Sequence, residues 1–248
     1  MIHTEKYIVH GTEIDHTYRL TEPYLLSLFQ DAFARYCAEL GIAAYDLQRD
    51  QKTWILSDFH ARFNGDLPRW NHEIRFDVWA RKNQSFRMYA DFRAFDGDGK
   101  LCASGTSCWL ILDEVLRIPV DHTETFSKLA LTSNQAVPGF RFAKMETIEG
   151  PAFEEMMKIR SSDIDFNLHL NSVRYIGAGI LGVPFNFRQR HRLTWLTIKY
   201  NQEAVLDQEL RSVTIAAGNK NLHLLTDQSG QIEYSRMITC WEGRHYTE

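Results

Sequence analysis

The order of the predicted secondary structure repeats along the chain, and this repeat constrains the fold more than any other feature. Each half holds one segment with helical spacing of apolar residues, followed by four segments rich in aromatic and branched residues, which is typical of strands. Glu13–Asp15 aligns with Asp163–Asp165 at an offset of 150, and Phe63–Asp66 aligns with Tyr200–Glu203 at a smaller offset. Because these weak matches occur in the same order, we interpret the chain as a tandem duplication.

The first half predicts a sheet wrapped on one long helix. Leu25, Phe29 and Tyr36 share one face of a helix predicted over residues 22–40, with Pro23 in its first turn and Gly41 after its end. Strands are predicted at residues 54–63, 73–81, 86–95 and 101–112. In the second of these strands the alternation is nearly strict, except that the apolar Trp79 falls on the polar side.

The second half predicts the same plan after a connector. A strand is expected at residues 156–165 and a helix at 171–181, and further strands at 193–200, 209–217, 222–226 and 232–241. Prolines and weak alternation mark the residues between the halves as a connecting segment. The expected fold class is therefore α+β, with one domain over residues 1–130, a linker over 131–155 and a second domain over 156–248, each an antiparallel sheet around a helix.

Charge and cysteine content narrow the classes of function. Lys and Arg number 28 against 32 Asp and Glu, so the net charge of −4 argues against nucleic-acid binding through a global positive field. The four cysteines form no Cys-x-x-Cys pair, which favours free thiols in a reducing compartment. We find no signal-peptide pattern and no run of 18 apolar residues, so we expect a cytoplasmic protein without a membrane-spanning segment.

The densest polar cluster of the chain lies between a predicted strand and a predicted helix, at residues 161–171. Asp165, Asn167 and His169 alternate there, so in an extended backbone they share one face, with apolar side chains on the other. A carboxylate, an amide and an imidazole that point together offer acid–base chemistry with a hydrogen-bonding orienter. The first half has Thr17 and Arg19 where the second has Asn167 and His169.

Two other interpretations of this cluster compete with the catalytic one. It can be a polar turn whose Asn171 caps the following helix. Asp163, Asp165 and Asn167 also copy the opening of a calcium-binding loop, but the sixth position is Leu168 rather than Gly and the twelfth is Arg174 rather than Glu. We therefore expect no metal at this loop.

Residues 162–177 closely resemble the active-site segment of acyl-acyl-carrier-protein thioesterases. The similarity continues through residues 198–203 and, more loosely, through the helix at 22–40 and the strand at 54–63, so it covers nearly the whole chain. The resemblance implies two tandem hot-dog domains and hydrolysis of fatty acyl thioesters on acyl carrier protein, without a cofactor. It also implies that Asp165, Asn167, His169 and Glu203 form the catalytic set.

The chain departs from the plant members of the family at one position. Those members carry a Cys directly after the acidic residue, whereas this chain has Ala204 there, so a thiol nucleophile is not available at that position. Two routes remain open for hydrolysis: His169 and Glu203 activate a water molecule, or Asp165 attacks the carbonyl and forms a transient anhydride. A helix beginning near Asn171 is expected to offer backbone N–H groups to the oxyanion.

Binding roles are predicted for two further groups of residues. By resemblance, Phe29, Trp54 and Phe59 are expected to line the acyl-chain pocket in the first domain, with core packing as the alternative. Arg188 and Arg190 lie in the most basic window and are expected to dock acyl carrier protein or its phosphopantetheine phosphate, with a solvated loop as the alternative.

Other functions are compatible with the same fold. They are an acyl-CoA thioesterase, a hot-dog dehydratase acting on a β-hydroxyacyl thioester, and a non-catalytic acyl-binding protein. A homodimer is also compatible with the sequence, although the tandem repeat already supplies the pairing that single hot-dog domains obtain by dimerising.

Overall fold

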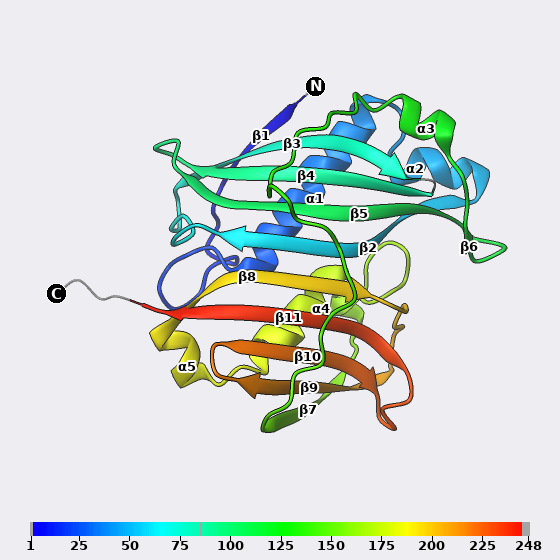
Figure 1. The fold of residues 1–248 in the computed structure, drawn as a ribbon. Coiled ribbons are helices and arrows are strands. Elements are labelled where there is room, and N and C mark those ends of the chain that lie inside the picture. The colour runs from blue at the N-terminus through cyan, green and yellow to red at the C-terminus, as the bar shows by residue number, and fades with distance from the viewer. Residues whose placement is uncertain (1, 85, 245–248) are drawn as a thin grey trace. The chain divides into compact units, whose positions relative to one another are not determined.

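The structure of the protein, a computed structural model, describes residues 2–84 and 86–244. It divides into two compact units, Met1–Phe140 and Arg141–Glu248, and each is an antiparallel sheet with helices packed on it (Figure 1). Within the described residues, no helix is both long and apolar enough to cross a lipid bilayer.

The first unit is built on the helix α1, Glu22–Glu39, which begins after Thr21 and has Pro23 in its first turn. The strands of its sheet, in spatial order, are β1 (His3–Ile8), β3 (Glu73–Gln84), β4 (Arg87–Asp96), β5 (Leu101–Asp113) and β2 (Lys52–Phe63). The described part of this unit also contains short elements: α2 (Ala44–Leu47), a 3-10 turn at Gln48–Asp50, the two-residue strand β6 (Ile118–Pro119) and α3 (Thr123–Ser127). The predicted helix and four strands are confirmed to within three residues at each end, whereas β1 was not predicted.

Aromatic side chains fill the space between α1 and its sheet. Phe29 contacts Phe59 and Phe92, with ring centroids 5.9 Å and 4.6 Å apart, and Phe33 contacts Trp54 at 6.2 Å. Trp54 and Phe59 would face opposite sides of a regular strand, but the register of β2 against β5 shifts between Leu56 and Asp58. This bulge inserts one residue and turns both rings toward the helix.

The segment after α3 covers the face of the first sheet opposite to α1. Met88, Ala90, Phe92 and Ala94 of β4 are fully buried on the helix side, so Asp91 lies on the other side, yet it is only 1% exposed. Thr132 N–H donates to the Ala80 carbonyl at 3.1 Å, and Trp79 Nε1 donates to the Asn134 carbonyl at 3.0 Å. The covering segment explains why the apolar Trp79 stands on the polar side of its strand.

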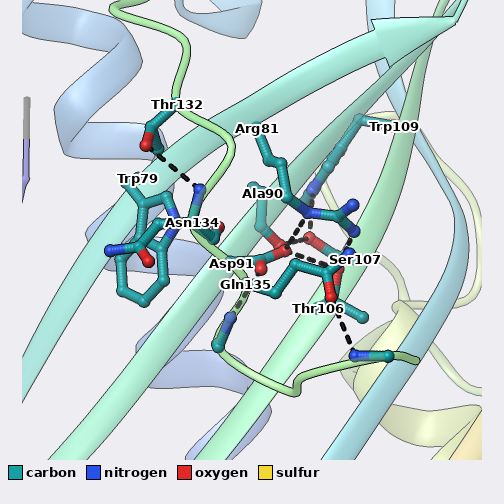
Figure 2. Close-up of polar contacts among 12 residues, drawn as sticks. Trp79, Arg81, Ala90, Asp91, Thr106, Ser107, Trp109, Thr132, Asn134 and Gln135 are labelled. Atoms are coloured by element: carbon teal, nitrogen blue, oxygen red, sulfur yellow. Dashed lines mark hydrogen bonds and ion pairs between the residues drawn. The ribbon is translucent and has the colours of Figure 1, made fainter. Parts of the chain in front are cut away.

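Asp91 is the central residue of the contacts beneath this segment (Figure 2). Its Oδ1 accepts from Thr106 Oγ1 at 2.6 Å and lies 3.3 Å from Arg81 Nε, while its Oδ2 accepts from Ala136 N–H at 2.8 Å. The carboxylate thus joins two neighbouring strands and the covering segment. Residues 132–136, predicted as linker, are therefore fixed against the first unit.

The second unit repeats this plan with a shorter helix, α4 (Ser172–Leu181). Its strands, in spatial order, are β8 (His191–Tyr200), β11 (Glu233–Gly243), β10 (Lys220–Asp227), β9 (Glu209–Ala217) and β7 (Ala152–Lys158). The short helix α5 (Phe185–Arg190) precedes β8. The predicted strand at 156–165 is wrong in position, because β7 begins at Ala152, inside the predicted linker, and Ser161–Asp163 form a 3-10 turn.

The helix α4 lies close to its sheet because it carries glycine where the two surfaces meet. A methyl group on Gly179 would lie 2.2 Å from Met237 Cε and 3.1 Å from His223 Cβ, so a larger residue would require the Met237 side chain to move. The sheet presents His223, only 3% exposed, at the same place. The two nitrogens of His223 lie 2.9 Å from Thr214 Oγ1 and 2.8 Å from Thr239 Oγ1, and burial lowers the pKa of this imidazole to about 3.

Candidate active site

Asp165 organises the polar loop that leads into α4. Its Oδ1 accepts from the backbone N–H of Asn167 at 2.9 Å and from that of His169 at 3.4 Å. The Asp165 N–H donates to the His169 carbonyl at 2.9 Å, and Leu168 adopts a left-handed φ of 64°. The carboxylate therefore closes a tight turn and determines where Asn167 and His169 lie.

In the middle of the loop, two apolar side chains are exposed while the polar side chains that alternate with them are partly buried. Phe166 is 68% exposed and Leu168 is 74% exposed, whereas Asp165, Asn167 and His169 are partly buried. An ordinary surface loop has the opposite arrangement. Three partly buried groups that can bind protons or donate hydrogen bonds make this loop a candidate functional site.

The structure brings His169 together with Glu203, which follows β8. His169 Nε2 lies 3.4 Å from Glu203 Oε2, and the two side chains are 23% and 28% exposed. Two backbone contacts set this distance: Leu170 N–H donates to the Ala204 carbonyl at 2.7 Å, and His169 forms a β-bridge with Val205. All four residues of the predicted catalytic set thus belong to two loops that are bonded to each other.

Ala204 lies in the contact between these loops and is fully buried. Its carbonyl accepts from Leu170 N–H, and its own N–H donates to the hydroxyl of Tyr175 at 3.1 Å. Sequence reasoning did not single out Tyr175. Comparison of the two halves would have found it, because the aligned position at the offset of 150 is Leu25.

The start of α4 differs from the expected oxyanion site. Asn171 caps the helix, and its Oδ1 accepts from Val173 N–H at 3.0 Å, while its carbonyl accepts from Arg174 N–H at 2.8 Å. Asn171 therefore occupies the N–H groups of both Val173 and Arg174. The expectation that the start of the helix offers free N–H groups to an oxyanion is wrong for these two groups. The side-chain amide of Asn167 remains the candidate donor.

The first unit contains the same turn without the imidazole. Asp15 Oδ1 accepts from Thr17 N–H at 2.8 Å and from Arg19 N–H at 3.4 Å, and Tyr18 has a left-handed φ of 60°. Arg19 lies 3.1 Å from Asp66, at the positions that align with His169 and Glu203. A guanidinium–carboxylate ion pair thus stands where the second unit has an imidazole and a carboxylate.

The predicted acyl-binding residues lie in the core of the first unit. Phe29 and Phe59 are buried almost completely, and Trp54 Nε1 donates to the Ile42 carbonyl at 2.8 Å. They contact one another and their neighbours as packed rings. Their role in lining an acyl pocket stays a prediction.

The two predicted docking arginines lie on α5. Arg188 is partly buried, its Nε donates to the Val183 carbonyl at 3.0 Å, and its guanidinium stacks over Phe185. Arg190 is exposed. Of the two, Arg190 is the better placed to meet a partner, because Arg188 is engaged in local structure.

The part of the chain that the structure describes contains no group of three or more His, Cys, Asp or Glu side chains arranged to hold a metal ion. In the loop considered as a calcium site, Asp163 Oδ2 accepts from Arg160 N–H at 3.0 Å and Asp163 Oδ1 faces Arg174 at 3.3 Å. With Asp165 Oδ1 holding the turn, the carboxylate oxygens serve the loop itself.

The fold and this pair of loops define a protein of two tandem hot-dog domains, each an antiparallel sheet around a helix. Solved structures share it over nearly the whole chain. An acyl-ACP thioesterase from Bacteroides thetaiotaomicron superposes with a TM-score of 0.87 at 20% identity, covering 97% of this chain and 98% of that one. A 12:0-ACP thioesterase from Umbellularia californica gives 0.87 at 19% identity, covering 98% of both chains.

Family models match both halves in order. The N-terminal domain of acyl-ACP thioesterases matches residues 1–129, and the C-terminal domain matches residues 147–243. The chain belongs to the acyl-ACP thioesterase family.

Curated relatives agree with this assignment. The chain is 21% identical over 239 residues to a chloroplastic acyl-[acyl-carrier-protein] hydrolase of Cuphea viscosissima, covering 88% of this chain and 54% of the relative. It is 21% identical over 269 residues to a chloroplastic palmitoyl-acyl carrier protein thioesterase of Gossypium hirsutum, covering 99% and 65%. The chain thus spans between about half and two thirds of the length of these relatives.

Proposed function

We propose that this protein hydrolyses fatty acyl thioesters carried by acyl carrier protein and releases the free fatty acid. The observation that carries the proposal is the pair of His169 and Glu203, 3.4 Å apart beside the Asp165 turn, in a member of the acyl-ACP thioesterase family. The names of the relatives support the same substrate class.

In the proposed reaction, His169 removes a proton from a water molecule whose oxygen attacks the thioester carbonyl. With the ring proton on Nε2 facing Glu203, Nδ1 carries the lone pair that accepts this proton, and the carboxylate of Glu203 stabilises the imidazolium. The Asn167 amide donates to the carbonyl oxygen as negative charge develops on it. The carbon–sulfur bond then breaks, and the thiol leaves with the proton from His169.

The alternative route, in which Asp165 attacks the carbonyl, receives less support from the geometry. Asp165 Oδ1 is engaged by two backbone N–H groups. Asp15 makes the same two contacts in the first unit, where Arg19 stands in place of the imidazole. Because the aspartate is present in the first unit, which lacks the imidazole, its carboxylate fits a role in shaping the turn. We therefore favour attack by water over attack by Asp165.

Acyl carrier protein as the partner and Arg190 as part of its docking surface belong to the same proposal. Arg190 is exposed at the end of α5, and a guanidinium suits both phosphate and the carboxylates of an acidic partner. A cytoplasmic location is likewise proposed. All four cysteines are free thiols, which suits a reducing compartment, and cell fractionation tests the location.

The experiment that tests the function measures thiol release from acyl-carrier-protein and acyl-CoA substrates of matched chain length. We expect turnover to be faster on the carrier substrate and to fall at least about 100-fold in His169→Ala. His72→Ala, which removes an exposed histidine from the first unit, is the matched control and should keep the wild-type rate. Acyl binding without thiol release, release only from acyl-CoA, or an enoyl product would each refute the proposal.

A further inference from the structure

The hydroxyl of Tyr175 lies between the two peptide groups that flank Glu203. It donates to the Gln202 carbonyl at 3.3 Å and accepts from the Ala204 N–H at 3.1 Å. Residue 203 is therefore held on both sides by one atom. Tyr175 itself belongs to α4, the helix that begins directly after the His169 loop.

Tyr175 is fixed by its surroundings. Its side chain is 5% exposed, and its ring meets the ring of Tyr200 edge-on, with centroids 5.4 Å apart at 90°. The hydroxyl of Tyr200 donates to the Ser172 carbonyl at 3.1 Å, at the start of α4. Burial raises the pKa of Tyr175 to about 12, so its hydroxyl keeps its proton at neutral pH and can donate and accept at once.

The two halves differ at these positions. Alignment at the offset of 150 places Leu25 opposite Tyr175, and the smaller offset places Phe63 opposite Tyr200. Both hydroxyls are thus present only in the unit that carries His169. Leu25 is fully buried, so the apolar side chain satisfies the packing requirement of the fold. Packing of the helix therefore does not require the hydroxyl of Tyr175, which instead supplies the two hydrogen bonds beside Glu203.

We propose that Tyr175 is a positioning residue, which fixes the backbone of Glu203 so that its carboxylate faces His169. This inference rests on the proposed function for its catalytic consequence. A shift of the carboxylate by a fraction of the side-chain length would separate it from the imidazole, and misplacement by about 1 Å can cost a factor of about 100 in rate. Tyr175 does not touch the reacting atoms and acts through Glu203.

The test compares Tyr175→Phe with Tyr36→Phe. Tyr36 is the matched control, because it is 2% exposed, lies on α1 and accepts from the Ala130 N–H at 3.4 Å, remote in sequence from Glu203. We expect Tyr175→Phe to lower kcat about tenfold or more while KM changes by less than about twofold. Tyr36→Phe should lose comparable thermal stability and keep kcat.

A double variant shows whether the effect passes through Glu203. In a Glu203→Gln background, measured at high enzyme concentration, adding Tyr175→Phe should change kcat by less than about twofold, because residues that act as a unit are not additive. An unchanged kcat in Tyr175→Phe, or the same factor of loss in both backgrounds, would overturn the proposal.

Amide hydrogen exchange separates this inference from the proposed function. Without the hydroxyl, the buried Ala204 N–H loses its acceptor, and its exchange should accelerate by at least about tenfold relative to wild type. If the wild-type protein releases no thiol, the proposed function fails, and the exchange of Ala204 alone then decides whether Tyr175 holds the loop. Unchanged exchange in Tyr175→Phe would show that it does not.

Discussion

Arg19 and Asp66 form, 3.1 Å apart, the ion pair that takes the place of His169 and Glu203 in the first unit. The turn beneath it is the same, since Asp15 and Asp165 make equivalent backbone contacts. The comparison predicts that the two positions respond differently to truncation. Arg19→Ala should change kcat less than about threefold, whereas His169→Ala should lower it at least about 100-fold. If thiol release showed equal losses of kcat in Arg19→Ala and His169→Ala, the proposal that only the second unit is catalytic would be contradicted.

Asp165 gives a second prediction. An asparagine at this position keeps an oxygen that can accept from the Asn167 and His169 N–H groups, whereas an alanine does not. Asp165→Asn should therefore retain activity within about tenfold of wild type, and Asp165→Ala should lose at least about 100-fold. If thiol release stops completely in both variants, Asp165 acts as the nucleophile and the water route is wrong.

Asp91 carries the third prediction, which concerns stability. Asp91→Ala removes the acceptor of Thr106 and Ala136 and leaves the partly buried Arg81 without its ion-pair partner. Loss of one partner of a buried pair costs about 3–5 kcal/mol, and we expect a decrease of that size in the free energy of unfolding in urea. Asp98→Ala, in an exposed turn, is the control and should stay within about 0.5 kcal/mol. Similar decreases in the free energy of unfolding for both variants would show that Asp91 does not stabilise the covering segment in this way.

His223 predicts a pH dependence of stability. The pKa of this imidazole is lowered from 6.5 to about 3 in the folded protein, so the unfolded chain binds its proton first as the pH falls. The contribution of the neutral His223 imidazole to the free energy of unfolding is therefore fully present above pH 6.5 and is lost progressively as the pH falls toward 3. Between pH 6.5 and pH 4 it amounts to about 3 kcal/mol. In His223→Gln the free energy of unfolding should fall less over this range. Parallel pH profiles for the two proteins would show that His223 is not responsible.

Arg190 carries the fifth prediction, for the carrier-bound substrate. Arg190→Glu reverses a charge on the exposed end of α5 and should raise KM for acyl carrier protein substrates several-fold, with KM for small thioesters unchanged. Arg49→Glu, an exposed charge reversal in the first unit, is the matched control. The docking role fails if both variants raise KM equally or neither does.

Elements with a regular apolar pattern were predictable from sequence. Phe29, Phe33 and Tyr36 recur on the face of α1 that the structure buries, and the alternation of β3 identified Trp79 as an exception that the covering segment explains. The strand β1 was missed because it alternates between exposed and half-buried residues, without an apolar stripe. The strand β7 was misplaced for the same reason, since nearly all of its residues are exposed.

The candidate site was predictable only in part. Alternation placed Asp165, Asn167 and His169 on one face, but it gave no sign that Phe166 and Leu168 would be the exposed ones. Glu203 is 34 residues beyond His169 and was identified through family resemblance, since no local pattern links the two. The cap at Asn171 was predicted from its residue type, but the sequence does not show that the cap takes up the Val173 N–H that an oxyanion would need.

The shared turn of Asp15 and Asp165 has a consequence for the evolvability of this chain. The backbone frame forms with Thr17 and Arg19 as well as with Asn167 and His169, so the frame does not depend on the chemistry it carries. Under the proposed function, a substitution at Asn167 or His169 changes reactivity and leaves the turn in place, and the side chains at positions 17 and 19 are free to vary without loss of thiol release. The duplication thus gives the chain a second backbone frame of the same geometry, on which other side chains can be placed.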